Sequence, residues 1–243
     1  MRDLVTLLWK PPTPPRRGPR PTLTLEAITR AGIAAADADG LTGVTMHRVA
    51  EAVGVTKMAL YRHVPGKAEL VALMLDCAIG APPDPRPEAS WRETLDAWAR
   101  GLYAAFCAHP WALEVAVGAR VIGPHELTWM EHAVTALTGS GLDGGEMLDV
   151  TVLLTGHVRN LAQQVTAISS ASNPEDAMSS LLHRVLADRE DRFPAVTAAM
   201  ASAKAAQGQD QALDFGLARI LDGVGALIDA RKDRVPGTSN LRP

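Results

Sequence analysis

Three polar side chains follow one another closely at the end of a helical pattern in residues 44–70. Tyr61 and His63 end the segment "TKMALYRH", and Lys67 opens the next apolar pattern. A phenol, a lysine ammonium and the free backbone amides at a helix start can all hold phosphate oxygens. The spacing therefore predicts that this stretch contacts an anionic partner such as a nucleic acid backbone.

Two short helices must position these side chains. Thr45 and Thr56 are expected to cap them, and Gly54 falls where a turn between helices needs an unhindered backbone. This spacing predicts a helix-turn-helix, in which the second helix presents its first turn to the major groove of double-stranded DNA. The exposed positions of that turn are Thr56, Lys57, Met58 and Ala59.

The motif resembles the N-terminal motif of the TetR family of bacterial repressors, most specifically in "LYRHVPGKAEL", and the resemblance covers about residues 24–75. It implies base-facing roles for His47, Thr56, Lys57, Met58 and Ala59. It implies phosphate contacts for Tyr61 and Lys67, and a bracing role for His63. Thr45 matches the family at the start of the motif and completes this DNA-binding set.

The rest of the chain is similar to the tetracycline-repressor branch of that family in "VAVGAR", "SGLDGGEML" and "GHVRNLAQQ". The resemblance implies a helical domain for ligand binding and dimerisation. In that branch a His and a Thr three residues later hold magnesium and drug, and here Ala116 and Ala119 stand in their places. We therefore expect neither a metal site nor a cofactor.

The two parts of the chain carry net charges of opposite sign. Residues 1–70 carry 10 Lys and Arg against 6 Asp and Glu, whereas the remainder carries 14 against 21. Residues 1–21 are rich in proline and include Arg16, Arg17 and Arg20, so we predict a disordered basic arm that follows the DNA backbone or enters a narrow minor groove. The alternative is that this segment is only a solvated tail without contact to DNA.

The pattern as a whole predicts an all-α protein, because apolar residues recur at steps of three and four and no sustained two-residue alternation occurs. "GAPPDPRPEA" separates a helix-turn-helix domain over 22–80 from a larger helical domain over 90–231, and 232–243 is expected to be a flexible tail. Ser90 and Glu93 form a predicted capping box at the start of the second domain. We expect a cytoplasmic protein that contacts no membrane, because no apolar run is long enough to span one.

The second domain holds candidates for a ligand pocket. The stripe of residues 147–168 is interrupted by His157 and Gln164, which need a hydrogen-bond partner in the core or at an interface, a water, or a ligand. Aromatic residues gather in the same domain, as expected of a ligand cavity and equally of an ordinary core. The candidate ligand residues are Trp98, Phe106, Trp111, Trp129, His157, Leu161 and Gln164.

A second apolar stripe consists of Leu213, Leu217, Ile220, Val224 and Leu227, and the family resemblance places both stripes in a bundle between two subunits. The leading hypothesis is a homodimeric repressor that binds a palindromic operator and is released by a small, largely apolar effector. One alternative is a helical enzyme that uses a pocket histidine, although no nucleophile motif, phosphate-binding loop or metal spacing is found. Another is a DNA-binding regulator without a small-molecule ligand.

Overall fold

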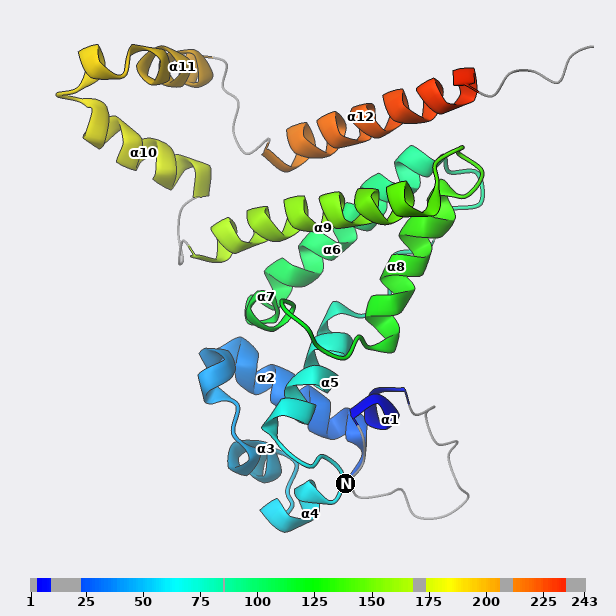
Figure 1. Ribbon diagram of the computed structural model, residues 1–243. Coiled ribbons are helices and arrows are strands. Elements are labelled where there is room, and N and C mark those ends of the chain that lie inside the picture. Colours follow the sequence, from blue (N-terminus) through cyan, green and yellow to red (C-terminus); the bar gives the residue numbers. More distant parts are fainter. Residues whose placement is uncertain (1–3, 10–22, 85, 168–173, 206–211, 235–243) are drawn as a thin grey trace, which may run out of the picture.

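The computed structural model describes residues 4–9, 23–84, 86–167, 174–205 and 212–234, and every regular element in these ranges is a helix (Figure 1). The prediction of an all-α protein is therefore confirmed. Arg16, Arg17, Arg20 and the segment after Arg234 lie outside the described residues.

The lower unit in Figure 1 consists of four helices: α2 (Leu25–Gly43), α3 (Met46–Ala52), α4 (Lys57–Tyr61) and α5 (Lys67–Ile79). Thr24 begins α2 by accepting a hydrogen bond from the backbone of Ala27. The helix kinks at Gly40, whose φ of +66° is open to glycine without strain. Ile28 of α2 and Met74 of α5 are fully buried between the helices, and they belong to a hydrophobic core that continues into the helices above.

The upper unit is built on three long helices, α6 (Trp91–Ala108), α8 (Pro124–Leu137) and α9 (Gly144–Ala167), with the short α7 (Ala112–Val115) between the first two. The last helix, α12 (Ala212–Arg234), packs on α6 and α9. Its Leu217 and Leu221 lie in the same core as Leu95 and Leu154. The predicted capping box at Ser90 and Glu93 is present at the start of α6.

Between α9 and α12 the chain makes an excursion that projects away from both units in Figure 1. It consists of α10 (Pro174–Leu186), a single turn over Glu190–Arg192 and α11 (Pro194–Ala205). Leu181, Val185, Phe193 and Val196 are exposed on it, at 40 to 47% of their full accessible surface. Within the described residues this hairpin therefore leaves apolar surface uncovered.

Residues 4–8 differ from the expectation of a uniform arm, because they form a short helix, α1 (Leu4–Leu8). Leu7 and Leu8 are buried, and α1 packs against α5. The apolar segment "LVTLLW" can bury its leucines against α5, and this burial favours a docked helix. The proline-rich sequence that follows has few apolar side chains to bury in this way.

Candidate nucleic-acid interface and ligand site

Two threonine side chains set the start of both helices of the motif. The Thr45 hydroxyl accepts the backbone N–H of Arg48 at 3.1 Å, and the Thr56 hydroxyl accepts that of Ala59 at 3.2 Å. Gly54 between the helices has a φ of +69°, which a residue with a side chain rarely adopts. The local sequence therefore fixes the geometry of a helix-turn-helix.

The motif is anchored by apolar side chains on one side and is polar on the other. Val49, Leu60 and Val64 are fully buried, whereas the helix start around Thr56 faces outward. The exposed members of the predicted set are Thr45, His47, Thr56, Lys57, Met58, Tyr61 and Lys67, while Ala59 and His63 are half-buried. Among the residues that the structure describes, Met58 is the most exposed large apolar side chain, at 73% of its accessible surface. The Met58 side chain is therefore not part of the packing that holds the motif together.

Tyr61 and Lys67, the two predicted phosphate contacts, also interact with other groups of the protein itself. The Lys57 ammonium lies 5.8 Å from the centre of the Tyr61 ring, one helical turn away, at the range of a cation–π contact. Lys67 donates to the backbone carbonyl of Leu41 at 2.7 Å, which ties the start of α5 to the end of α2. Lys67 therefore has a structural bond in addition to any contact with phosphate.

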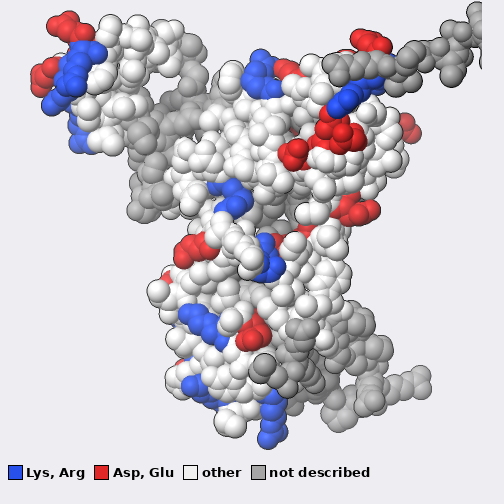
Figure 2. Space-filling model, viewed as in Figure 1, with Lys and Arg blue, Asp and Glu red and all other residues white. Residues whose placement is uncertain are grey.

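Two arginines that the sequence reasoning did not single out belong to the same unit. Arg62 is exposed at the C-cap of α4, next to Tyr61. Arg48 on α3 pairs with Asp39 and also reaches the carbonyl of Gly43. Arg62 could have been predicted from the sequence, because it is the arginine of "LYRH" beside Tyr61. Figure 2 shows Lys and Arg side chains over the lower unit, down to its tip.

The junction between the two units is polar. Asp37 of α2 accepts hydrogen bonds from the indole N–H of Trp111 at 2.7 Å and from His109 Nδ1 at 2.8 Å. Asp76 of α5 is buried and receives the backbone N–H groups that begin α8. Carboxylates of the lower unit thus hold groups of the upper one at two places.

The four aromatic candidates for the ligand site are buried, at 5% exposure or less. Trp98 donates its indole N–H to the carbonyl of Trp129 at 2.7 Å, and Trp129 donates to that of Gly80 at 2.8 Å. The two rings meet edge to face with centroids 5.4 Å apart. These side chains hold α5, α6 and α8 together, and Phe106 lies in the same continuous core.

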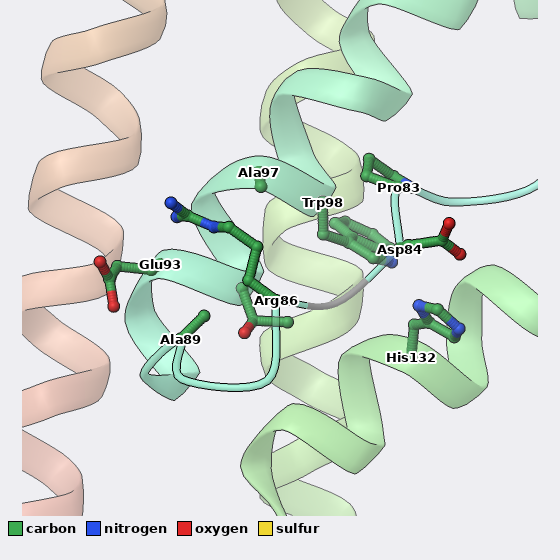
Figure 3. A pocket seen from close by; sticks show the side chains of 9 residues that line it. Pro83, Asp84, Arg86, Ala89, Glu93, Ala97, Trp98 and His132 are labelled. Carbon is green, nitrogen blue, oxygen red and sulfur yellow. The ribbon is translucent and has the colours of Figure 1, made fainter.

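Trp98 also borders a small cavity between the chain at 83–89, α6 and α8. Figure 3 shows Trp98 and His132 pointing into this region, with Asp84 and Arg86 from the connecting segment around them. The cavity measures only about 30 Å³, which is room for a water molecule or two. As folded, it is too small for an organic effector.

A larger hollow, of about 340 Å³, lies at the junction of the two units. Trp111 lines it together with Ala36 and Asp37 of α2, Glu114 of α7 and the side chains at the end of α9. Trp98 and Trp111 therefore border separate spaces.

His157, Leu161 and Gln164 contribute to neither cavity. His157 lies so closely against Gly216 of α12 that a Cβ at the glycine would overlap the imidazole Nε2 atom. This nitrogen is buried and has no hydrogen-bond partner among the described residues. Leu161 is half-buried, and Gln164 is exposed and donates to Asn160. The structure thus does not gather the seven candidate side chains in one pocket.

Cys77 and Cys107 are free, and burial raises the pKa of both thiols, which opposes a role as nucleophile. The described residues contain no group of three His, Cys, Asp or Glu side chains that could hold a metal ion. None of the helices within the described ranges is long and apolar enough to cross a membrane.

Comparison with known proteins agrees with this geometry. Residues 28–74 match the family model "Bacterial regulatory proteins, tetR family", and residues 83–228 match "Tetracyclin repressor-like, C-terminal domain". The chain is 36% identical to the HTH-type transcriptional repressor DrrR1 of Streptomyces coeruleorubidus, over 93% of this chain and 86% of that protein.

More distant relatives share the same architecture. The tetracycline repressor protein class C of Escherichia coli is 23% identical over 83% of this chain and 90% of its own. Apo ActR of Streptomyces coelicolor superposes with a TM-score of 0.71 at 24% identity, over 87% of this chain and 99% of that one. With both domain models matched and a close relative along most of its length, the chain belongs to the TetR family of helix-turn-helix transcriptional regulators.

Proposed function

We propose that the protein is a homodimeric repressor in the cytoplasm, where its DNA lies, that binds a palindromic operator and leaves it when a small, largely apolar molecule binds the upper unit. The observation that carries this proposal is the outward-facing start of α4, with Met58 and Lys57 exposed above a buried core. Such a helix start fits the major groove. The 36% identical relative is itself named a repressor.

A second copy of the chain is the partner best suited to α9 and α12. Both helices expose apolar side chains although they pack on each other: Leu148, Val152 and Leu153 on α9, and Phe215 and Leu227 on α12. Gly156 and Gly223 have open space where a Cβ would stand, so a partner helix could approach closely there. We call these seven residues the dimer surface.

Release by a ligand is supported by a related structure. ActR of Streptomyces coelicolor, 25% identical, has been solved in complex with (S)-DNPA, with a TM-score of 0.69. In the present chain, the hollow of about 340 Å³ beside Trp111 is the candidate space for the ligand, whereas the cavity beside Trp98 would have to widen to admit one. His157 supports a ligand role in another way, because its buried Nε2 lacks a partner among the described residues.

The proposal includes no catalytic activity. His109 and His125 each lie beside an aspartate, but these carboxylates hold a tryptophan indole and the start of a helix. An acid–base pair needs access to substrate, and these pairs are taken up by the junction between the units.

The test begins with operator duplexes that the full-length protein selects from a random DNA library. A palindromic consensus with two half-sites about one helical turn or a multiple apart is expected. A library of apolar small molecules is then screened for operator release and thermal stabilisation together. A compound bound beside a tryptophan is expected to quench the fluorescence of that tryptophan. The variants Trp98→Phe and Trp111→Phe therefore show which cavity the compound enters, because quenching is lost when the neighbouring tryptophan is replaced. Selection of no sequence at all would refute the proposal, whereas a consensus without any releasing compound would favour a regulator that needs no small molecule.

A further inference from the structure

The N-terminal helix connects parts of the molecule that are far apart in sequence. Leu7 and Leu8 are 4% and 7% exposed, and they cover the side of α5. Val5 on the same helix is open to solvent at 45%. A helix of five residues is not stable by itself in water, so α1 exists because it is docked.

Trp9 extends this contact to the upper unit. Its indole N–H donates to the backbone carbonyl of Ile122 at 3.1 Å, across 113 residues of sequence. Ile122 lies in the loop of residues 116–123, between α7 and α8. The Trp9 side chain keeps 44% of its surface exposed, so little burial reinforces the bond.

The start of α8, directly after this loop, is fastened to α5 as well. One oxygen of Asp76 accepts the backbone N–H of His125 at 2.9 Å and that of Glu126 at 3.3 Å, and the other lies 3.0 Å from His125 Nδ1. Gly123 permits this approach, because a Cβ there would overlap the Asp76 carboxylate. The end of the loop that leads into α8 is therefore held to α5 in two ways, directly through Asp76 and indirectly through the bond of Trp9 to Ile122.

α5 is the helix that both units share. It begins at Lys67, bonded to α2 of the lower unit, and ends beside α8 of the upper one. A change in how the loop is attached to α5 would therefore change how the lower unit is held for DNA. A contact made by one exposed indole and two leucines is weak enough to open and close.

We propose that Leu4–Trp9 is a clasp that holds the loop of residues 116–123 against α5 and so maintains the arrangement that binds the operator. Opening of the clasp loosens the loop and lowers operator affinity before any effector is present. This inference rests on the proposed function only in its second part, since loosening of the loop can be measured without DNA.

Hydrogen–deuterium exchange of the full-length protein tests the first part. Trp9→Phe removes the N–H donor and keeps an aromatic ring, and Leu8→Ser weakens the docking of α1. Both variants should exchange faster than wild type in peptides covering 116–126, by about three- to tenfold for the loss of one hydrogen bond. Peptides within α9 should not change. Val5→Ser, on the open side of α1, is the matched control and should behave as wild type. Unchanged exchange of 116–126 in both variants would overturn the clasp.

Operator affinity tests the second part, using the duplex selected with the wild-type protein. Trp9→Phe and Leu8→Ser should bind it about three- to tenfold more weakly, and Val5→Ser equally well. Faster exchange together with unchanged affinity would show that the loop does not set the position of the lower unit, and the proposal would fail there. If the wild-type protein selected no operator, the proposed function would fall while the exchange result still judged the clasp.

Discussion

Asp76 shows how one buried carboxylate can join the lower unit to the upper one. At 6% exposure it would be destabilising without partners, yet both of its oxygens are used, by the backbone of α8 and by the His125 ring. The helix start supplies a partial positive charge as well as free N–H donors. Asp76 therefore acts as the cap of a helix that begins almost fifty residues later in the chain.

Replacing Asp76 by alanine leaves the first backbone N–H groups of α8 without an acceptor in a buried place. The free energy of unfolding should fall by about 1–3 kcal/mol, since that is the usual penalty when a buried donor is left unpaired. Urea denaturation followed by circular dichroism measures it. Asp84→Ala, at an exposed position of the connecting segment, is the control and should change stability little. Equal stability of the two variants would show that water replaces the carboxylate.

At this scale the sequence is informative only over short distances. The predicted capping box of Ser90 and Glu93 is confirmed, because both partners lie within one helical turn. The bond of Trp9 to Ile122 and that of Asp76 to His125 depend on how distant helices pack, which no local pattern encodes. Their partners could not be inferred without the fold.

Among the elements, α12 is fastened by charge as well as by its core face. Arg231 near its end pairs with Glu146 at the start of α9, and Asp222 in its middle pairs with Arg92 of α6. The hydrogen bond from Arg231 holds the pKa of the Glu146 carboxyl below its ordinary value, and that from Arg92 lowers the pKa of Asp222. Both groups are ionised more easily in the folded protein than in the unfolded chain.

Because these pKa values are lowered on folding, their contribution to stability is present at neutral pH and is lost as the pH falls through the folded pKa values. We expect the contacts of α12 to loosen in acid, below the ordinary carboxyl range. In Arg231→Gln the Glu146 carboxyl should titrate nearer its ordinary pKa, which a carboxyl-detected NMR titration measures. Arg219→Gln, which leaves this pair intact, is the control. An unmoved Glu146 titration in Arg231→Gln would mean that the pair is absent in solution.

The dimer surface yields a matched pair of variants. Leu153 is 54% exposed, so Leu153→Glu should leave the protomer folded and separate the dimer, as seen in sedimentation velocity. Leu217 is fully buried within its own chain, so Leu217→Glu should unfold the upper unit, with a cost of several kcal/mol for a desolvated charge. A Leu153→Glu variant that remains dimeric at micromolar concentration would place the interface elsewhere.

Leu153 and Leu217 also show what helical periodicity cannot predict, namely which apolar side of a helix faces the core and which faces a partner. The stripe with Leu217 and Val224 is apolar as predicted. These two side chains are buried in the core of their own protomer, however, and are not left exposed for a partner subunit. α12 is apolar on more than one side, since Phe215 and Leu227 are exposed while Leu217 is buried. Spacing alone cannot assign such sides to the core or to a partner.

For the whole molecule, the asymmetry of charge predicts how it meets DNA. The basic excess lies in residues 1–70, and the exposed cations of the lower unit, such as Lys57 and Arg62, surround the motif. Each phosphate contact releases counterions, so operator affinity should fall steeply with salt. The acidic remainder of the chain would be repelled by the same backbone, which favours approach by the lower unit.

The arginines before α2 can be tested without disturbing α1. Replacing Arg16, Arg17 and Arg20 together by alanine should flatten the plot of log affinity against log salt by about one unit for each phosphate that is no longer neutralised. The melting temperature should stay the same. A triple variant of Arg184, Arg189 and Arg192, in the projecting hairpin, changes the net charge equally and is the control. The same slope in both variants would leave the arginines before α2 without a role in binding.

Fold class and motif are therefore accessible from the sequence, and the ligand site is not. The helix-turn-helix is recognised from residues within one short window, with Thr45, Gly54 and Thr56 at fixed offsets. A ligand cavity is the space left between helices that are distant in sequence. Trp98, Trp111 and His157 are candidates because of their chemistry, but packing places them in three different surroundings.

The place of α12 in the chain has a consequence for biosynthesis. Leu217, Leu221 and Ile228 complete a core whose other walls, α6 and α9, leave the ribosome about a hundred and about fifty residues earlier. Until α12 is made, these helices present an open apolar face to the cell, and half of the surface for a second subunit does not yet exist. The helices of the lower unit, α2 to α5, lie within residues 25–79 and are made long before this. Nascent chains should therefore acquire a folded DNA-reading head while still monomeric, and pairing of two chains must wait until α12 has been made and packed.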